Sequence, residues 1–333
     1  MKKVAINGFG RIGRLALRLI TNMDDIEVVA INDLANVEDL YYLLKYDSTF
    51  TNFEIDNLSY TEDSIIVNDK TIKVYKEKDA SNLPWGELGI DIVLECTGFY
   101  TDEESAMSHI NAGAKHVIIS APAKGNLKTI VYGVNSNILD GNELVISAAS
   151  CTTNCLAPVL NIIDANFHIK KGFMTTIHAT TNDQTTLDVV HKKGAMSRRG
   201  RSALVNIIPA STGAAKAIGK VLPHLDGLLS GSAFRVPVAD GSVIDLTLEV
   251  ENHVTKEEIN EAFKINQNEV IKYTEDPIVS SDVIGLTSAA LVDGLSTDVV
   301  TDESGKQLVK IVAWYDNELS YTSQMIRTMK VLI

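Results

Sequence analysis

The residues best suited to chemistry lie at positions 150–155, where the sequence reads Ser-Cys-Thr-Thr-Asn-Cys. Cys151 follows the apolar run 144–146, which is typical of a buried strand. It precedes the apolar run 156–163, which is typical of a buried helix. Cys151 is therefore predicted to lie at a helix N-terminus, where unpaired backbone N–H groups and the helix dipole favour a thiolate. The stretch predicts a nucleophilic thiol.

A nucleophilic thiol needs a base beside it, and His178 is the best candidate. It ends the segment 172–178, which alternates as a strand does. We predict that Cys151 and His178 form a catalytic pair. The competing interpretation is a buried structural cysteine and a solvated histidine. Cys155 lies one helical turn after Cys151 and is expected to face the packed side of the helix.

A second motif, near the N-terminus, predicts a dinucleotide site. The apolar strand 4–6 leads into a G-x-G-x-x-G loop formed by Gly8, Gly10 and Gly13, and a helical pattern follows. The glycines let the backbone approach a pyrophosphate at the positive end of the helix. Asp33 lies twenty residues after Gly13, where a carboxylate can bind a ribose diol and repel a 2′-phosphate. This predicts NAD rather than NADP; the alternative is a glycine turn in a non-binding α/β protein.

The elements around these motifs predict an α/β chain with two domains. Strands and helices alternate through residues 1–149, which predicts a Rossmann-type doubly wound parallel sheet in an NAD-binding domain. Thr97 follows one of these strands, at the sheet edge where ligands bind. Residues 150–315 are predicted to form an α+β catalytic domain. The C-terminal helix within 316–333 is expected to pack back on the first domain.

Three further segments carry specific expectations. Residues 64–74 resemble a β-hairpin that turns at Asn-Asp-Lys. Residues 181–208 form a long polar loop, and a loop of that length in a compact domain is usually functional. Pro158 lies beyond the first turn of the helix that Cys151 begins, and is expected to kink it.

Composition narrows the classes of protein. The chain has 333 residues, a net charge of −13 and 45% apolar residues, values typical of a soluble protein that does not bind nucleic acid. No stretch is apolar and long enough to span a membrane, and the N-terminus does not resemble a signal peptide. The three cysteines are too few for a disulfide framework, so a cytoplasmic location is expected. No second pair of ligands completes a metal site around Cys151 and Cys155.

A thiol beside a nicotinamide cofactor can add to an aldehyde, and the thioester formed by hydride loss needs an acceptor. Hydroxyls, backbone N–H groups and arginines bind phosphate well. The candidates of this kind are Ser150, Thr152, Thr181, Arg198, Arg199, Ser211, Thr212, Gly213 and Arg235. Taken singly, each could instead be a surface turn or a solvated cation.

These residues lie in stretches that resemble the phosphorylating glyceraldehyde-3-phosphate dehydrogenase family over essentially the whole chain. The most specific are S-C-T-T-N-C at 150–155 and A-S-T-G-A-A-K-A at 210–217. The other matching stretches are 5–14, 148–158, 175–179, 206–217, 234–237 and 314–318. The resemblance implies a glycolytic or gluconeogenic enzyme that converts D-glyceraldehyde 3-phosphate to 1,3-bisphosphoglycerate through a cysteine thiohemiacetal and thioester.

The resemblance also implies roles for individual residues. Cys151 would be the nucleophile and His178 the base. The attacking inorganic phosphate would bind Ser150, Thr152, Thr212 and Gly213. The substrate's C3 phosphate would bind Thr181, Arg235 and either Arg198 or Arg199, and the loop spacing leaves that choice open. The cofactor contacts implied by the match are Arg11, Ile12, Asp33, Lys78, Ser120 and Asn317, with Asn317 holding the nicotinamide carboxamide.

The family forms homotetramers in which the loop 181–208 packs against a neighbouring subunit's cofactor site. This chain has Val190 where the family usually has proline, a departure that bears on how strictly a 2′-phosphate is excluded. Two other functions stay open. One is erythrose-4-phosphate dehydrogenase, a relative with the same thiol and histidine. The other is an interaction protein of the same fold without catalysis.

Overall fold

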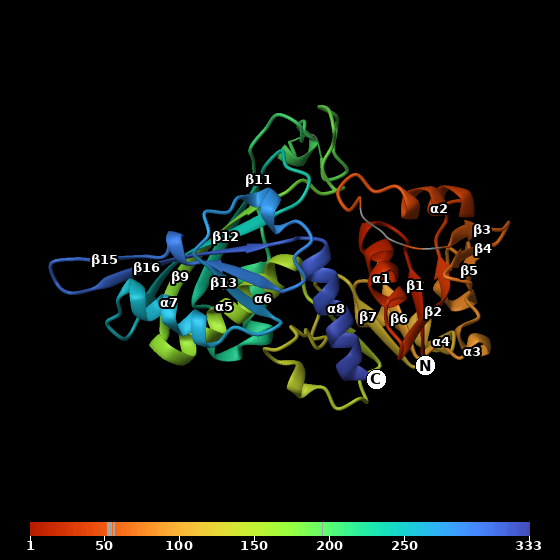
Figure 1. Cartoon of the computed structure of the whole chain (residues 1–333), viewed down its shortest axis with the longest axis horizontal. Helices are drawn as coiled ribbons and strands as arrows, with labels where there is room; N and C mark the ends of the chain where they lie inside the picture. Colours follow the sequence, from red (N-terminus) through yellow and green to blue (C-terminus); the bar gives the residue numbers. More distant parts are fainter. Residues whose placement is uncertain (52–54, 56, 195) are drawn as a thin grey trace. The chain divides into compact units, whose positions relative to one another are not determined.

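The structure is a computed structural model and describes residues 1–51, 55, 57–194 and 196–333 (Figure 1). The described residues divide into two compact units. The first unit comprises Met1–Tyr132, Ser136–Ser150 and Thr322–Ile333, and the second comprises Gly133–Asn135 and Cys151–Tyr321. The helix α8 (Leu319–Leu332) contributes to both units.

The first unit is built on a sheet with the strand order β3-β4-β5-β2-β1-β6-β7-β8, parallel from β5 to β8. Its strands are β1 (Lys2–Asn7), β2 (Ile26–Asn32), β3 (Leu58–Tyr60), β4 (Ser64–Val67), β5 (Lys70–Tyr75), β6 (Ile92–Glu95), β7 (His116–Ile119) and β8 (Val145–Ser147). Its other helices are α1 (Arg11–Thr21), α2 (Val37–Lys45), α3 (Trp85–Leu88) and α4 (Glu103–Asn111). The apolar residues 4–6 of β1 and 92–94 of β6 are wholly buried, as in strands covered on both faces. The predicted doubly wound sheet is confirmed.

The strand order of this sheet indicates the edge at which a ligand is expected to bind. The strand β1 lies between β2 and β6, so the chain winds in opposite directions from β1. In such sheets the crevice at the carboxyl ends of the strands beside the switch point binds ligands. The register aligns Asn7 at the end of β1 with Asn32 of β2 and Glu95 of β6. Three polar side chains therefore end neighbouring strands at that edge.

The predicted hairpin is confirmed between β4 and β5. Its turn residues Asn68 and Asp69 have φ values of 48° and 65°, a left-handed conformation that Asn and Asp adopt more readily than other residues with a side chain.

The second unit has a mixed sheet with the order β10-β11-β9-β12-β16-β14-β13, and β15 pairs with β16. Its strands are β9 (Ile169–His178), β10 (Ile208–Ser211), β11 (Leu229–Arg235), β12 (Ser242–Val250), β13 (Ile271–Thr274), β14 (Ala290–Asp293), β15 (Asp298–Thr301) and β16 (Gln307–Tyr315). Its helices are α5 (Cys151–Phe167), α6 (Ala214–Val221) and α7 (Lys256–Ile265). The α5 helix continues past Pro158 without ending there.

Burial alternates strictly along β12, so this sheet has one packed face and one partly exposed face. Ile244, Leu246 and Leu248 are wholly buried, and α5 packs against β9, β12, β14 and β16 (Figure 1). Thr176 and His178 alternate onto the packed face of β9, where α5 begins. The loop 181–208 is irregular apart from a short 3-10 turn at Arg198–Gly200 and the start of β10, as expected. In the described part of the chain, no helix combines the length and apolar character needed to cross a membrane.

Candidate active site

The turn between β8 and α5 presents Cys151. Ala149, within this turn, is buried and has a φ of 59°, a strained conformation for a residue with a side chain. Its N–H donates to Ser147 Oγ at 3.1 Å, which holds the sharp turn. Cys151 then begins α5, whose first turn, fully within the described residues, has no acidic side chain. The nucleophile candidate thus lies at the positive end of a long helix, half-buried.

Cys151 and His178 lie in contact. The Cys151 Sγ and His178 Nε2 atoms are 3.3 Å apart, although the residues are 27 positions apart in the chain. The register explains the rest of the group, because β9 and β11 are parallel and align His178 with Arg235 at their carboxyl ends. The structure therefore brings the thiol, the imidazole and a guanidinium together at one end of the sheet.

The environment of His178 favours a neutral imidazole. Burial, followed by the positive charges of Arg235 and Arg199, lowers the pKa of His178 to about 3. His178 Nδ1 lies 2.8 Å from the carbonyl of Ala179, which accepts a proton carried on Nδ1. It also lies 2.6 Å from Arg235 Nη1, which can donate only to an unprotonated Nδ1. Arg235 Nη1 donates to the same carbonyl at 2.9 Å. The tautomer with hydrogen on Nδ1 leaves the Nε2 lone pair facing the thiol, as a general base requires.

Opposing effects act on the thiol. Burial raises the pKa of Cys151, and the charge of Arg235 together with hydrogen bonds from Thr152 opposes that rise. Thr152 and Thr176 each lie 2.9 Å from the hydroxyl of Tyr315. Tyr315 is buried, and its ring meets the His178 ring edge-on at 6.0 Å between centroids. Sequence reasoning missed Tyr315; the signal was its place at the inward-facing end of an alternating strand.

The arginine pair separates in the structure. Arg199 pairs with Asp183, which also accepts a hydrogen bond from the hydroxyl of Thr181. The charge of Arg235 lowers the pKa of Arg199, after the larger effect of burial. Arg198 is instead exposed; together with Arg199 it lines an open cavity that also includes Ser197 and Ser211. Thr181, Arg199 and Arg235 therefore form one polar group, and Arg198 lies outside it.

Thr212 and Gly213 lie at the start of α6. The Thr212 hydroxyl accepts the N–H of Ala214 at 3.1 Å, a local capping bond. Among the described residues, neither Thr212 nor Gly213 shares a hydrogen bond with the Cys151–His178 pair. Ser150 precedes Cys151 directly and is the last residue of its segment of the first unit.

The first unit contains a cavity of about 510 Å³ at the predicted ligand edge of its sheet. Of the predicted cofactor residues, Gly8, Gly10, Asp33, Lys78 and Thr97 line it. It is also lined by Asn7, Asn32, Leu34, Glu77, Cys96, Phe99 and Tyr100, which sequence reasoning did not select. The other predicted cofactor residues do not line this cavity. Arg11 pairs with Asp47, and Ser120 hydrogen-bonds Cys96. Ile12 is half-buried, Gly13 is buried, and Asn317 belongs to the second unit.

The glycine loop fits a dinucleotide. A Cβ on Gly13 would lie 2.2 Å from the carbonyl oxygen of Gly8, so the turn and the helix can approach only without a side chain. A Cβ on Gly10 would meet nothing within 4 Å and would enter the cavity that a pyrophosphate needs. The Asp33 carboxylate accepts the N–H of Phe9 at 2.8 Å and that of Ala35 at 3.0 Å, which holds it at the cavity wall. It retains lone pairs for a ribose diol.

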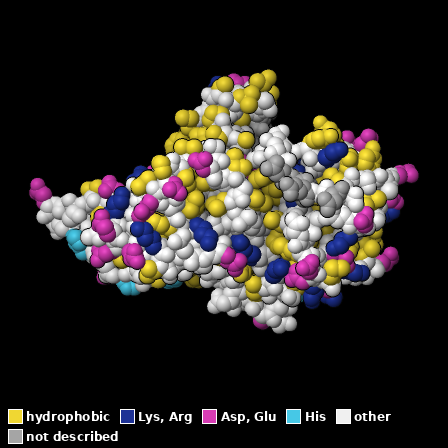
Figure 2. Space-filling view, viewed as in Figure 1, with side chains coloured by type: hydrophobic (Ala, Val, Ile, Leu, Met, Phe, Trp, Pro, Cys, Tyr) yellow, Lys and Arg dark blue, Asp and Glu magenta, His cyan; other side chains and the backbone are white. Residues whose placement is uncertain are grey.

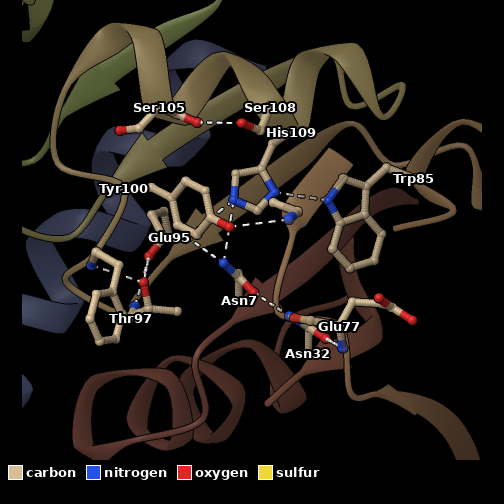
Figure 3. A network of polar contacts seen from close by, with 12 residues as sticks. Asn7, Asn32, Glu77, Trp85, Glu95, Thr97, Tyr100, Ser105, Ser108 and His109 are labelled. Atoms are coloured by element: carbon tan, nitrogen blue, oxygen red, sulfur yellow. Dashed lines mark hydrogen bonds and ion pairs between the residues drawn. The ribbon is translucent and has the colours of Figure 1, made fainter. Parts of the chain in front are cut away.

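A buried polar network stands behind this wall (Figure 3). Glu95 accepts hydrogen bonds from Asn7 Nδ2 at 2.5 Å and from the Thr97 N–H at 2.8 Å. His109 Nε2 lies 3.1 Å from Glu95, and Trp85 Nε1 donates to His109 Nδ1 at 3.0 Å. Asn7, Glu95, His109 and Trp85 are all buried. The network fixes Asn7 and Thr97, both of which line the cavity.

Comparisons with known proteins agree with this geometry. Residues 2–103 match the family model described as the NAD binding domain of glyceraldehyde 3-phosphate dehydrogenase, and residues 150–317 match its C-terminal domain. A glyceraldehyde-3-phosphate dehydrogenase from Clostridium pasteurianum is 58% identical over 99% of this chain and 98% of its own length. That of Clostridium acetobutylicum is 57% identical with the same coverage. That of Streptococcus pyogenes is 51% identical over 98% of this chain and 97% of its own.

Proposed function

Because the chain belongs to the glyceraldehyde-3-phosphate dehydrogenase family, we propose that it oxidises D-glyceraldehyde 3-phosphate with NAD and inorganic phosphate to give 1,3-bisphosphoglycerate. The reaction would serve glycolysis or gluconeogenesis. The observation that carries the proposal is the 3.3 Å contact between Cys151 Sγ and His178 Nε2. A thiol and a neutral base in contact at a helix N-terminus are the parts that covalent aldehyde oxidation needs.

The first unit supplies the cofactor site, and the second supplies the catalytic groups. Gly8, Gly10 and the start of α1 would hold the pyrophosphate of NAD, and Asp33 its adenosine ribose. Lys78, Thr97 and Ser120 would contact the rest of the cofactor, and Asn317 its carboxamide. When bound, NAD accepts the hydride that the substrate carbon loses.

The steps performed by the chain begin with proton transfer. His178 Nε2 takes the thiol proton, and the Cys151 sulfur forms a bond to the aldehyde carbon as the C=O π bond breaks. The imidazolium of His178 then returns the proton to the carbonyl oxygen, which gives a thiohemiacetal and a neutral His178. His178 then accepts the hydroxyl proton as the hydride departs with its electron pair and the carbonyl re-forms as a thioester. A phosphate oxygen attacks that carbonyl and the thiolate leaves, which restores Cys151. The Tyr315 hydroxyl holds Thr152 beside the sulfur throughout.

Two groups of side chains would bind the phosphates. Thr181, Arg199 and Arg235 suit the C3 phosphate, because two guanidinium groups are held near each other with one carboxylate, Asp183, between Arg199 and Thr181. An incoming phosphate would replace Asp183 as the partner of Thr181. The second group, which would bind the attacking phosphate, is Ser150, Thr152, Thr212 and Gly213.

The proposal is tested by steady-state NADH production while aldehyde, NAD and phosphate are varied in turn. Turnover should require inorganic phosphate or arsenate, and Cys151→Ser should abolish it. Cys155→Ser is the matched control, since Cys155 is buried and its thiol donates to the backbone carbonyl of Ala313 at 3.9 Å. Full activity in Cys151→Ser would exclude the mechanism. Preference for erythrose 4-phosphate over D-glyceraldehyde 3-phosphate would contradict the proposed substrate.

We also propose a cytoplasmic homotetramer. The loop 181–208 carries exposed apolar side chains at Leu187, Val190, Val205 and Ile207, and Figure 2 shows hydrophobic atoms gathered over the loop that projects from the second unit. The outward face of the second sheet adds an open cavity of about 540 Å³ lined in part by Ile177, Val243 and Trp314. Surfaces of this kind suit contacts between subunits. Analytical ultracentrifugation at micromolar concentration tests the assembly; a monomer there would contradict it.

A further inference from the structure

We propose that Asp240 and Asp316 share one proton in the working enzyme, carried by Asp240, and that this pair positions Asn317 and the support of His178. The shared proton is independent of the proposed function, whereas the positioning role rests on it. Both residues are buried: Asp240 is 2% exposed and Asp316 is 0% exposed. Asp240 lies between β11 and β12, and Asp316 directly follows β16.

The geometry requires a proton between them. The two carboxyl groups lie near enough to each other for a hydrogen bond between them, and each shifts the pKa of the other. Two ionised carboxylates have only acceptors, so a hydrogen bond between them needs one carboxyl group to be protonated. Among the described residues, the hydrogen bonds of both carboxyl groups otherwise come from backbone N–H groups and from no cation. Charge compensation by a salt bridge is therefore not what holds the pair.

The hydrogen-bond partners identify the carrier. Asp316 accepts three backbone N–H groups: Gly285 at 2.8 Å on Oδ2, and Glu318 at 2.9 Å and Leu319 at 2.7 Å on Oδ1. Such a set stabilises an ionised carboxylate. Asp240 accepts Gly241 at 2.7 Å and Asn317 at 3.1 Å, both on Oδ1.

The other oxygen of Asp240 completes the assignment. In the described part of the chain, Asp240 Oδ2 is buried without a partner that could donate to it. A proton on Oδ2, directed at Asp316, satisfies this atom and supplies the bond between the two carboxyl groups. Asp240 is thus the acid and Asp316 the carboxylate.

The surroundings keep the proton bound at neutral pH. Burial, followed by the negative charge of Asp316, raises the pKa of Asp240 to about 9, and Glu318 before α8 acts in the same direction. Cys151 at the start of α5 is the other titratable group that interacts with Asp240. Gly285 contributes a backbone N–H to Asp316. A thiolate on Cys151 would hold the proton more firmly still.

The pair is connected to both functional groups of this unit. The Asn317 N–H donates to Asp240 Oδ1, and the Ser242 hydroxyl donates to Asn317 Oδ1 at 2.6 Å. Ser242 Oγ also accepts the N–H of Ala179 at 3.0 Å, and the carbonyl of Ala179 lies 2.8 Å from His178 Nδ1. Loss of the shared proton would leave two neighbouring carboxylates negatively charged, and their repulsion would disturb this chain of hydrogen bonds. Asp240 and Asp316 are positioning residues, since neither touches the reacting atoms.

Two amide substitutions distinguish the carrier from the acceptor. In Asp240→Asn the amide N–H₂ replaces the acid proton and the amide oxygen keeps both N–H bonds. We expect its dissociation constant for NAD to stay within about twofold of the parent. In Asp316→Asn an N–H₂ group meets backbone N–H donors, and we expect NAD binding to weaken about tenfold or more. Equal effects of the two substitutions, or a larger effect of Asp240→Asn, would overturn the positioning role.

The proton itself is observed by infrared difference spectroscopy of the intact protein at pH 7. The carbonyl band of a protonated carboxyl group should be present in the parent and absent in Asp240→Asn. Its absence from the parent, or its persistence in the variant, would overturn the shared proton whatever the enzyme's substrate proves to be. If Asp316→Asn does not fold, the melting temperature of Asp240→Asn tests the shared proton instead. This temperature should rise relative to that of the parent as pH increases from about 5 to about 9, because the folded parent holds a proton that the unfolded chain releases. A constant difference would exclude the proposal.

Discussion

Trp85 donates its indole N–H to His109 Nδ1 at 3.0 Å, and this contact determines the charge of the network behind the cofactor cavity (Figure 3). An indole N–H can only donate, so His109 Nδ1 carries no proton. The proton of the neutral ring is then on Nε2, which donates to Glu95. The carboxylate of Glu95 is consequently buried and stabilised by hydrogen bonds from Asn7, Thr97 and His109 rather than by a cation.

Replacing Trp85 with Phe should destabilise the protein. The substitution removes the donor and leaves His109 Nδ1 buried without a partner, and it also removes part of a fully buried ring. We expect a loss of about 2–4 kcal/mol in the free energy of unfolding. Urea unfolding measures it. Trp314→Phe is the matched control, because Trp314 is only partly buried and its N–H reaches Asp293 at 3.3 Å. A smaller loss for Trp85 than for Trp314 would contradict this account of the network.

The same network shows which features could be predicted from the sequence and which could not. The glycine loop, the strand before it and Asp33 have fixed spacings, and local spacing predicted both the fold of the first unit and its cofactor. Asn7, Asn32 and Glu95 are far apart in the sequence and meet because β2, β1 and β6 are parallel and in register. Their common feature, a polar residue ending an apolar strand, was visible, but the strand order that brings them together was not.

The second unit repeats this contrast. Cys151 and His178 could be selected as a pair from their chemistry, yet the partner of His178 depends on the alignment of β9 with β11, which places Arg235 beside it. Tyr315 lies opposite Ser242 through the register of β16 and β12. Neither alignment follows from local patterns. The choice between Arg198 and Arg199 likewise depends on which way an irregular loop turns, and only the structure places Arg199 against Asp183.

Asp33 should set the choice between NAD and NADP. Its carboxylate is held at the cavity wall by the N–H groups of Phe9 and Ala35. Asp33→Asn keeps an acceptor but removes the charge that repels a 2′-phosphate. We expect the ratio of kcat/KM for NAD to that for NADP to fall about tenfold. Asp47→Asn is a control, since Asp47 pairs with Arg11 and does not line the cavity. An unchanged ratio in Asp33→Asn would mean that this carboxylate does not reach the ribose.

The neutral state of His178 should make the protein sensitive to acid. The imidazole has an ordinary pKa of 6.5 and a folded pKa of about 3. The unfolded chain therefore binds a proton that the folded chain does not, and this group lowers the stability as pH falls from about 6.5 towards about 3. His178→Asn removes this loss of stability. As pH falls from 7 to 4, its melting temperature should therefore rise relative to that of the parent. A difference in melting temperature between His178→Asn and the parent that stays constant across this pH range would contradict the account.

Arg199 rather than Arg198 should bind the phosphate of the substrate. The side chain of Arg199 is 16% exposed and lies near enough to Arg235 for the two like charges to interact unfavourably, a cost that a bound dianion would reverse. Arg199→Gln should therefore raise the KM for the phosphorylated aldehyde about tenfold or more, with a smaller effect on the KM for inorganic phosphate. Arg198→Gln removes the same charge from an exposed side chain and should change either KM by no more than about twofold. The reverse order of effects would place the phosphate beside Arg198 instead.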